Sequence, residues 1–231
     1  MIVERDVDAA ALYERTRLAL LDLVESLTAA QRRTTVPASP AWSVQDVVAH
    51  VTGIAADLNA GHLPDVEPEA WTADQVETRR GRTIEDLRAE WDAEAPAFED
   101  GLRLFGYAVG SHFLGDLLQH LCDVRHALGL PRIAADESLR VALDFYLDSF
   151  HESLVEAGIG SVVVTVGDRP WTLGAGEVIA TWSVDRFECF RALGGRRDEA
   201  QMRGAAWTGD VDRIVGLVSR YGLPTEGIAE P

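Results

Sequence analysis

The sequence predicts a mainly α-helical protein that ends in a small unit of mixed α and β structure. Apolar residues recur three to four positions apart through the first two-thirds of the chain, which is the spacing of a buried helix face. Two helix-start signals, Ser43 with Asp46 and Thr83 with Asp86, lie in the same part. After Gly158 the chain becomes rich in β-branched residues and turns. We therefore expect a helical bundle over residues 1–158 and a small α+β domain over residues 159–231.

The bundle can be divided into helices by its apolar spacing and its end signals. The expected helices cover about residues 6–27, 44–59, 83–105, 107–128 and 136–158. A capping box at Ser43, with Trp42 packing on Val47, starts the second helix. Residues 60–82 are polar and lack helical periodicity over much of their length. We expect a long loop there, and loops of this length commonly form a lid or a pocket rim.

The C-terminal part contains three short stretches with strand character. Residues 161–166 are β-branched, residues 171–173 follow a Gly-Asp-Arg-Pro turn, and residues 178–182 resemble a third strand. Two short helices are expected after them, over about residues 184–193 and 210–221.

Composition limits the partners that this protein can have. The net charge is −17 over 231 residues, and such a surface repels phosphate backbones and anionic membranes. We therefore expect neither nucleic acid nor a membrane as a partner. No apolar run is long enough to span a bilayer and the N-terminal residues do not resemble a signal peptide, so the expected location is the cytoplasm. The two cysteines, Cys122 and Cys189, lack a metal-binding spacing and are expected to be reduced and buried, although the position of Cys122 leaves a catalytic thiol open.

The helix over residues 107–128 carries an unusual polar stripe. Asp116, His120 and Asp123 are spaced four and three residues apart, so they share one face of a helix that is otherwise apolar. A carboxylate and an imidazole one turn apart can reach a single divalent ion, but the same spacing also suits a plain ion pair. His50 strengthens the metal interpretation because a neighbouring helix of the bundle would supply a second imidazole. His50, Asp116 and His120 would form a three-ligand set with an open position, as catalytic zinc sites do.

Three segments resemble the mycothiol-dependent enzymes of the maleylpyruvate isomerase type, which have a DinB-like helical bundle. Residues 42–50, Trp-Ser-Val-Gln-Asp-Val-Val-Ala-His, resemble the family's Trp-Thr-Val-x-Asp-Leu-x-x-His segment, whose His binds metal. The segment Asp116-x-x-x-His120-x-x-Asp123 is similar to its Glu-x-x-x-His-x-x-Asp segment, whose Glu and His bind metal. Residues 190–197 are similar to the Gly-Arg ending of the family's C-terminal domain.

The resemblance covers nearly the whole chain and implies an up-and-down DinB-like bundle, a divalent metal ion, usually zinc, and mycothiol as co-substrate. Mycothiol belongs to actinobacteria, which agrees with a chain whose 21 basic residues are all Arg. One departure is that Asp116 stands where the family has Glu, so metal affinity or metal choice can differ. A rival ligand set of His112, Asp116 and His120 stays open, with His50 structural. Asp123 is expected to accept a hydrogen bond from a ligating imidazole rather than to bind the ion.

The resemblance also implies a substrate-binding arginine in the C-terminal domain. Arg196 is the best match and Arg191 the next, although arginines on so acidic a protein are often only solvated or salt-bridged. The expected activity is addition of the metal-activated thiol to a small electrophile, as an isomerase or as a thiol S-transferase. A non-catalytic metal- or ligand-binding protein and a thiol-independent metal hydrolase remain alternatives. The electrophile, the physiological metal and the oligomeric state are left open by the sequence.

Overall fold

The computed structural model describes residues 4–63 and 68–230, and these form two compact units. The helical unit consists of residues 8–110 and 120–132. The C-terminal unit consists of residues 4–7, 111–119 and 133–230. One long helix, α6 (Tyr107–Ala127), contributes residues to both. The predicted domain boundary after residue 158 stays a prediction.

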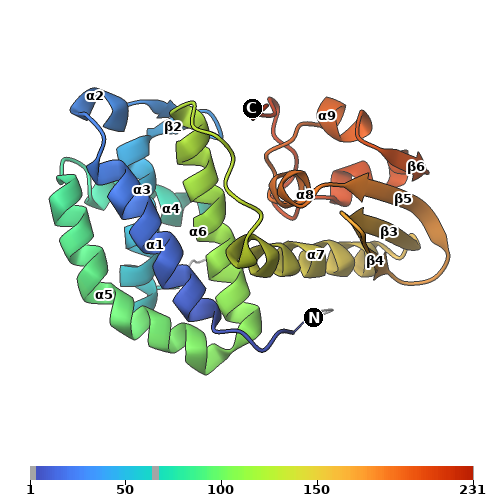
Figure 1. Cartoon of the computed structure of the whole chain (residues 1–231), viewed down its shortest axis with the longest axis horizontal. Coiled ribbons are helices and arrows are strands. Elements are labelled where there is room, and N and C mark those ends of the chain that lie inside the picture. The colour runs from blue at the N-terminus through green and yellow to red at the C-terminus, as the bar shows by residue number, and fades with distance from the viewer. Residues whose placement is uncertain (1–3, 64–67, 231) are drawn as a thin grey trace. The chain divides into compact units, whose positions relative to one another are not determined.

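The helical unit is built from long helices that pack along their apolar faces. In Figure 1, α1 and α5 lie next to α3. The helices are α1 (Ala9–Glu25), α2 (Ala29–Arg32), α3 (Val44–Asn59), α4 (Pro68–Thr78) and α5 (Ile84–Phe105), with part of α6. The core between them is apolar and includes Leu20, Val47 and Leu87, none of which is exposed to solvent. The prediction of a mainly helical protein is confirmed for this unit.

Both predicted capping boxes are present. The Ser43 side chain accepts a hydrogen bond from the Asp46 backbone N–H, and the Asp46 carboxylate accepts from the Ser43 backbone N–H at 2.8 Å. Thr83 and Asp86 make the same pair of contacts at the start of α5. These contacts satisfy backbone donors that a helix start otherwise leaves unpaired. They fix where α3 and α5 begin.

The predicted long loop over residues 60–82 is wrong over residues 68–78, because α4 lies there. Residues 64–67 lie outside the described part of the chain. The helix was missed because few of its residues are apolar, so it has no clear helical periodicity. Its position instead depends on Gly53 of α3, where an added Cβ would lie 2.7 Å from the Gln75 side chain of α4. Gly53 therefore lets the two helices approach closely. The hairpin of β1 (Thr35–Val36) and β2 (Ser39–Ser43) was also not predicted.

The C-terminal unit contains α7 (Glu137–Ala157), a four-stranded sheet, α8 (Arg186–Leu193) and α9 (Glu199–Arg203). The strands are β3 (Ser161–Val166), β4 (Arg169–Gly174), β5 (Val178–Val184) and β6 (Trp207–Gly209), in the spatial order β4-β3-β5-β6. β3 pairs parallel with β5, while the two outer pairs are antiparallel. α7 packs against β4 and α8. The small α+β unit predicted from the sequence is thus present.

The helix predicted over residues 210–221 is wrong. The chain forms only two 3-10 turns there, Val211–Arg213 and Val215–Leu217. Ile214, Val215 and Val218 are buried at helix-like spacing, which explains the prediction. Gly216 lies between the buried positions and weakens a continuous helix, since glycine costs about 1 kcal/mol relative to alanine in a helix interior.

None of the helices in the described ranges combines the length and apolar composition needed to cross a membrane.

Candidate metal centre

His50 lies on the buried face of α3, and a chain of hydrogen bonds orients its ring. Its side chain is 4% exposed, and Nδ1 lies 2.8 Å from Oε1 of Gln75. The amide nitrogen of Gln75 donates to Oδ2 of Asp57 at 2.8 Å. A carboxylate can only accept, so the amide oxygen of Gln75 must face His50, and Nδ1 of His50 must carry the proton. This arrangement leaves the Nε2 lone pair of His50 available for a metal ion.

The environment also keeps His50 uncharged. Burial lowers the pKa of His50 to about 4, against a partial opposing effect of the hydrogen bond to Gln75. The ring is therefore neutral at physiological pH, which is the form that binds metals.

Asp116 and His120 lie one turn apart on α6, so the helix itself sets their spacing. The His50 and His120 rings approach to 5.0 Å between centroids in an edge-on arrangement. One ligand atom from each of His50, Asp116 and His120 can be chosen so that all three lie within 4.8 Å of one another. Ligands about 2.1 Å from a tetrahedral zinc ion lie roughly 3.4 Å apart, so small side-chain rotations would bring the three ligand atoms to the spacing that zinc requires. The donor set fits a divalent ion with an open position.

Asp123 lies close to the His120 ring. Its Oδ2 is 3.8 Å from Nδ1 of His120, longer than a hydrogen bond, and the carboxylate is almost fully buried. A carboxylate facing Nδ1 favours the tautomer that presents Nε2 to a metal. The role expected for Asp123 stays a prediction.

His112, the rival ligand, makes a different contact. Its ring stacks on Phe145 with 4.2 Å between centroids and 15° between planes. In the described part of the chain, the cluster of possible ligands contains His50 and does not contain His112.

A cavity lies beside His50 in the helical unit. It has a volume of about 570 Å³ and is lined by residues of β2, α3 and α4, among them Trp42, Asp46 and Asp74. The Trp42 ring also contacts His50, with 4.8 Å between centroids. Residues 60–82 were expected to form a pocket rim as a loop. The part of this segment that lines the cavity is the helix α4.

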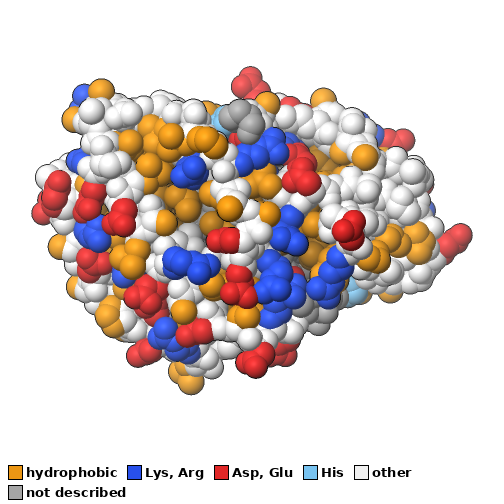
Figure 2. All heavy atoms as spheres, viewed as in Figure 1, with side chains coloured by type: hydrophobic (Ala, Val, Ile, Leu, Met, Phe, Trp, Pro, Cys, Tyr) orange, Lys and Arg blue, Asp and Glu red, His pale blue; other side chains and the backbone are white. Residues whose placement is uncertain are grey.

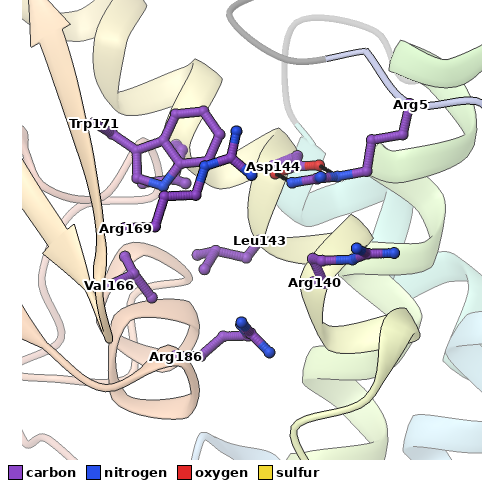
Figure 3. Close-up of a pocket in the computed structure, with 9 residues that line it drawn as sticks. Arg5, Arg140, Leu143, Asp144, Val166, Arg169, Trp171 and Arg186 are labelled. Carbon is purple, nitrogen blue, oxygen red and sulfur yellow. Dashed lines mark hydrogen bonds and ion pairs between the residues drawn. The ribbon is translucent and has the colours of Figure 1, made fainter.

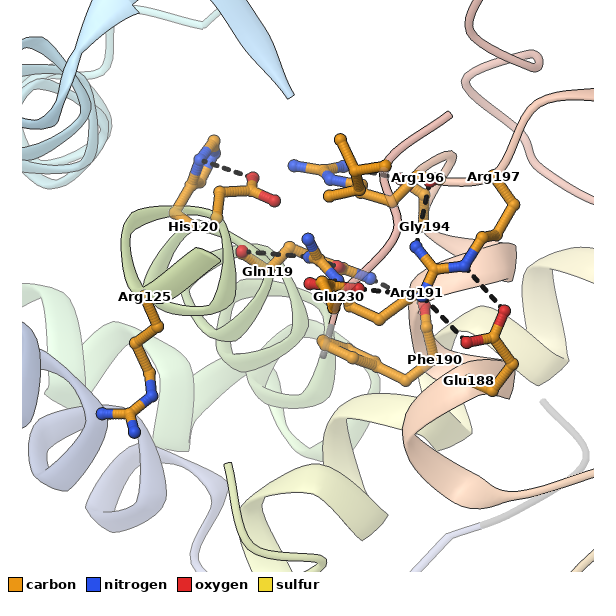
Figure 4. A network of polar contacts seen from close by, with 12 residues as sticks. Gln119, His120, Arg125, Glu188, Phe190, Arg191, Gly194, Arg196, Arg197 and Glu230 are labelled. Carbon is orange, nitrogen blue, oxygen red and sulfur yellow. Dashed lines mark hydrogen bonds and ion pairs between the residues drawn. The ribbon is translucent and has the colours of Figure 1, made fainter. Parts of the chain in front are cut away.

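Arg191 is part of a buried ion-pair network in the C-terminal unit (Figure 4). Its guanidinium is 0% exposed, contacts the side-chain oxygen of Gln119, and forms an ion pair with Glu230 at 2.8 Å. The Glu230 carboxylate also pairs with Arg197 at 2.8 Å. These contacts of Arg191 join α8 to α6 and to the last residues of the chain, so its guanidinium stabilises the fold. Its assignment to substrate binding stays a prediction.

Arg196 follows a turn that depends on two glycines. A Cβ on Gly194 would overlap the Gln119 amide at 1.9 Å, and Gly195 has φ +76°, a conformation that disfavours side chains. The Arg196 guanidinium donates to the Gly194 carbonyl at 2.6 Å. It also lies within electrostatic reach of Tyr146. The pKa of Tyr146 is raised, mainly by burial and further by the charge of Asp116, and the charge of Arg196 partly opposes this rise. Arg196 and Asp116 thus act on the same buried hydroxyl.

The two cysteines are free and buried, as expected. Burial raises the pKa of Cys189, so its thiol stays protonated.

Sequence reasoning missed Gln75, Asp57 and Tyr146. Gln75 belongs to a helix that was expected to be a loop, and nothing in its neighbourhood indicated a contact with His50. Tyr146 lies among the buried apolar residues of α7, where a tyrosine carries no signal of function in the sequence.

The fold and the cluster together define a class of protein: a helical bundle with two buried histidines and a half-buried aspartate that can hold a metal ion. Residues 13–107 match the family described as the mycothiol maleylpyruvate isomerase N-terminal domain. This match confirms the family resemblance predicted from the sequence.

Two solved structures are similar to this chain, namely the mycothiol-dependent maleylpyruvate isomerase and a variant of it with one histidine replaced by alanine. The identities are 16% and 15%, and each alignment has a TM-score of 0.50 and covers 81% of this chain and 88% of the other. At this identity the likeness shows the fold alone, and it confirms the DinB-like bundle followed by a small α+β unit. No curated protein matches the sequence.

Proposed function

We propose that this protein is a metal-dependent enzyme that activates a low-molecular-weight thiol, mycothiol, for addition to a small electrophile, as an isomerase or as an S-transferase. The observation that carries this proposal is the approach of His50, Asp116 and His120 to within 4.8 Å of one another. The family match over residues 13–107 supports the choice of co-substrate.

His50 and His120 would hold the ion through their Nε2 atoms, and Asp116 through one carboxylate oxygen. Two neutral imidazoles and one carboxylate leave a zinc ion with net positive charge and an open position. When bound, the ion supplies the charge that favours the thiolate form of the co-substrate at neutral pH. Asp116 is shorter than glutamate, so we propose monodentate binding by Asp116.

Arg196 is the residue that we assign to the substrate. Its guanidinium can bind a carboxylate with two parallel hydrogen bonds, and its charge, like that of Asp116, acts on the Tyr146 hydroxyl. Arg191 would act indirectly, because it fixes Gln119 and the turn that carries Arg196.

The cavity beside α4 is the place that we assign to the body of the thiol. Its volume of about 570 Å³ lies in the range of small-molecule sites. Trp42 lines this cavity and also contacts the His50 ring, so it connects the cavity to the proposed metal ligands.

The test measures the metal content of the purified protein and then the consumption of mycothiol by the zinc-loaded form with a panel of electrophiles that includes maleylpyruvate. We expect turnover that needs both metal and thiol, and its loss in His50→Ala. His62→Ala is the matched control, because His62 is exposed and outside the cluster. Turnover without thiol would point instead to metal-assisted hydrolysis, and full metal content without turnover would point to a binding protein.

A further inference from the structure

A second polar cavity lies in the C-terminal unit, and arginines dominate its lining. It is a cavity of about 40 Å³ between α7, the end of β3, β4 and the first residue of α8. Four of its nine lining residues are Arg5, Arg140, Arg169 and Arg186, while its single acidic residue is Asp144. Figure 3 shows this arginine cavity. In a chain of net charge −17, such a local excess of cations needs an explanation.

Two of the four arginines are already paired with carboxylates. Arg5 donates two hydrogen bonds to Asp144, one of them at 2.8 Å from Nη2. Arg140 pairs with Glu137 at 2.6 Å through Nη2. Its Nε atom is buried and has no hydrogen-bond partner among the described residues. A buried N–H donor without an acceptor is costly, so Arg140 keeps unused hydrogen-bonding capacity.

Arg169 and Arg186 are the two arginines that keep their charge available. Neither forms an ion pair within the described ranges of the chain. The Arg169 guanidinium lies 4.0 Å from the Trp171 ring centroid, and Arg186 donates only a long contact of 3.4 Å to the Ala135 carbonyl. The stacking on Trp171 holds Arg169 in place without neutralising it. Two guanidinium groups with available donors are suited to an oxyanion.

The other walls of the cavity are apolar. Leu143 and Leu147 of α7 and Val166 of β3 are buried at its base. A fully hydrated inorganic ion gains nothing from such walls, whereas a short hydrocarbon group does.

We propose that the arginine cavity binds a small organic anion, whose oxyanion group lies on Arg169 and Arg186 and whose apolar part contacts Leu143, Leu147 and Val166. The oxyanion can be a carboxylate or a phosphate group, since both accept bidentate hydrogen bonds from arginine. None of the residues in this cavity belongs to the proposed metal ligands, so this site does not depend on the proposed function.

The first experiment is calorimetric titration of the purified full chain with acetate, butyrate and inorganic phosphate at constant ionic strength. We expect saturable binding. Each methylene group should tighten binding by about fourfold, so butyrate, which has two more than acetate, should bind more tightly than acetate by about fourfold twice over. A higher affinity for phosphate than for butyrate would support the oxyanion site and identify a phosphate group as its source. No saturable binding of any of the three would overturn the proposal.

The second experiment locates the site. The double variant Arg169→Gln, Arg186→Gln should bind roughly a hundredfold more weakly or not at all, since each charge-assisted hydrogen bond contributes about tenfold or more. Arg213→Gln is the matched control, because Arg213 belongs to the same unit and does not line the cavity. Both arginines of the double variant are partly or fully exposed, so the variant should keep the wild-type melting temperature.

Trp171 provides an independent readout. Anion binding should change tryptophan fluorescence in the wild type, and this change should be lost in Trp171→Phe while calorimetric binding remains. Unchanged affinity in the double variant, or an unchanged fluorescence response in Trp171→Phe, would show that any binding occurs elsewhere.

Discussion

Replacing Gln75 by leucine tests whether a residue outside the proposed ligand set controls the metal centre. The Gln75 amide accepts from Nδ1 of His50 at 2.8 Å and is 2% exposed. Leucine is similar in size but offers no acceptor, so the buried Nδ1–H of His50 would lose its partner. Leaving a buried donor unpaired costs about 1–3 kcal/mol of unfolding free energy. It also frees the His50 ring to rotate or change tautomer, which removes the Nε2 lone pair from the ion.

We therefore expect Gln75→Leu to weaken zinc binding by roughly ten- to a hundredfold, which is the usual effect of losing a residue that orients a ligating histidine. The measurement is zinc titration against a competing chelator, combined with thermal unfolding with and without zinc. Gln45→Leu is the matched control, because Gln45 also lies on a helix of this unit and its amide donates to the exposed Arg82 carbonyl, away from the His50 ring. A zinc affinity of Gln75→Leu within about twofold of the wild type would refute the tautomer argument.

Three further variants test other parts of the structure. His120→Ala should abolish stoichiometric metal binding while the circular dichroism of a helical protein is retained, and a full equivalent of metal in this variant would disprove the ligand set. Gly53→Ala should lower the melting temperature and the zinc affinity together, because the added Cβ would lie 2.7 Å from the Gln75 side chain. Gly101→Ala is the control: its added Cβ would have no neighbour within 4 Å, so this variant should stabilise the protein by about 0.5–1 kcal/mol in thermal unfolding. Arg196→Ala should cut turnover of anionic electrophiles by about ten- to a hundredfold without changing metal content, and wild-type rates with every anionic electrophile would exclude Arg196 from substrate binding.

Much of the helical unit could be predicted because its signals are local. The capping boxes at Ser43 and Thr83 depend on residues three positions apart, and the apolar spacing of α3 and α5 is regular. The ligand candidates were found for the same reason, since Asp116 and His120 lie one turn apart on one helix. His50 is preceded by one of these capping boxes, so its place on a helix was also clear.

What could not be predicted depends on contacts between distant segments. The stability of α4 comes from its approach to Gly53 rather than from its own pattern, and the short β1–β2 hairpin has too few residues for a period to show. The burial of Arg191 requires Glu230, nearly forty residues later in the chain. A sequence shows the charge of an arginine but not the carboxylate that neutralises it.

The charge of the whole chain gives an equally incomplete account of its surface. Figure 2 shows basic and acidic side chains next to one another on the face in view, so local fields differ from the average. The arginine cavity is an example, because its four cations face one lining carboxylate in a chain with 17 excess negative charges.

The dependence of His50 on α4 links metal affinity to local unfolding. α4 has few apolar residues of its own, so we expect its docking on α3 to open locally without loss of the whole fold. Only the docked state has the Gln75 acceptor in place. In the limit where the undocked state binds the ion far more weakly, the apparent dissociation constant equals the intrinsic constant divided by the docked fraction. If α4 were docked one-tenth of the time, zinc would bind ten times more weakly. By the same linkage, bound zinc would protect the backbone amides of α4 from hydrogen exchange, although α4 supplies none of the proposed ligands.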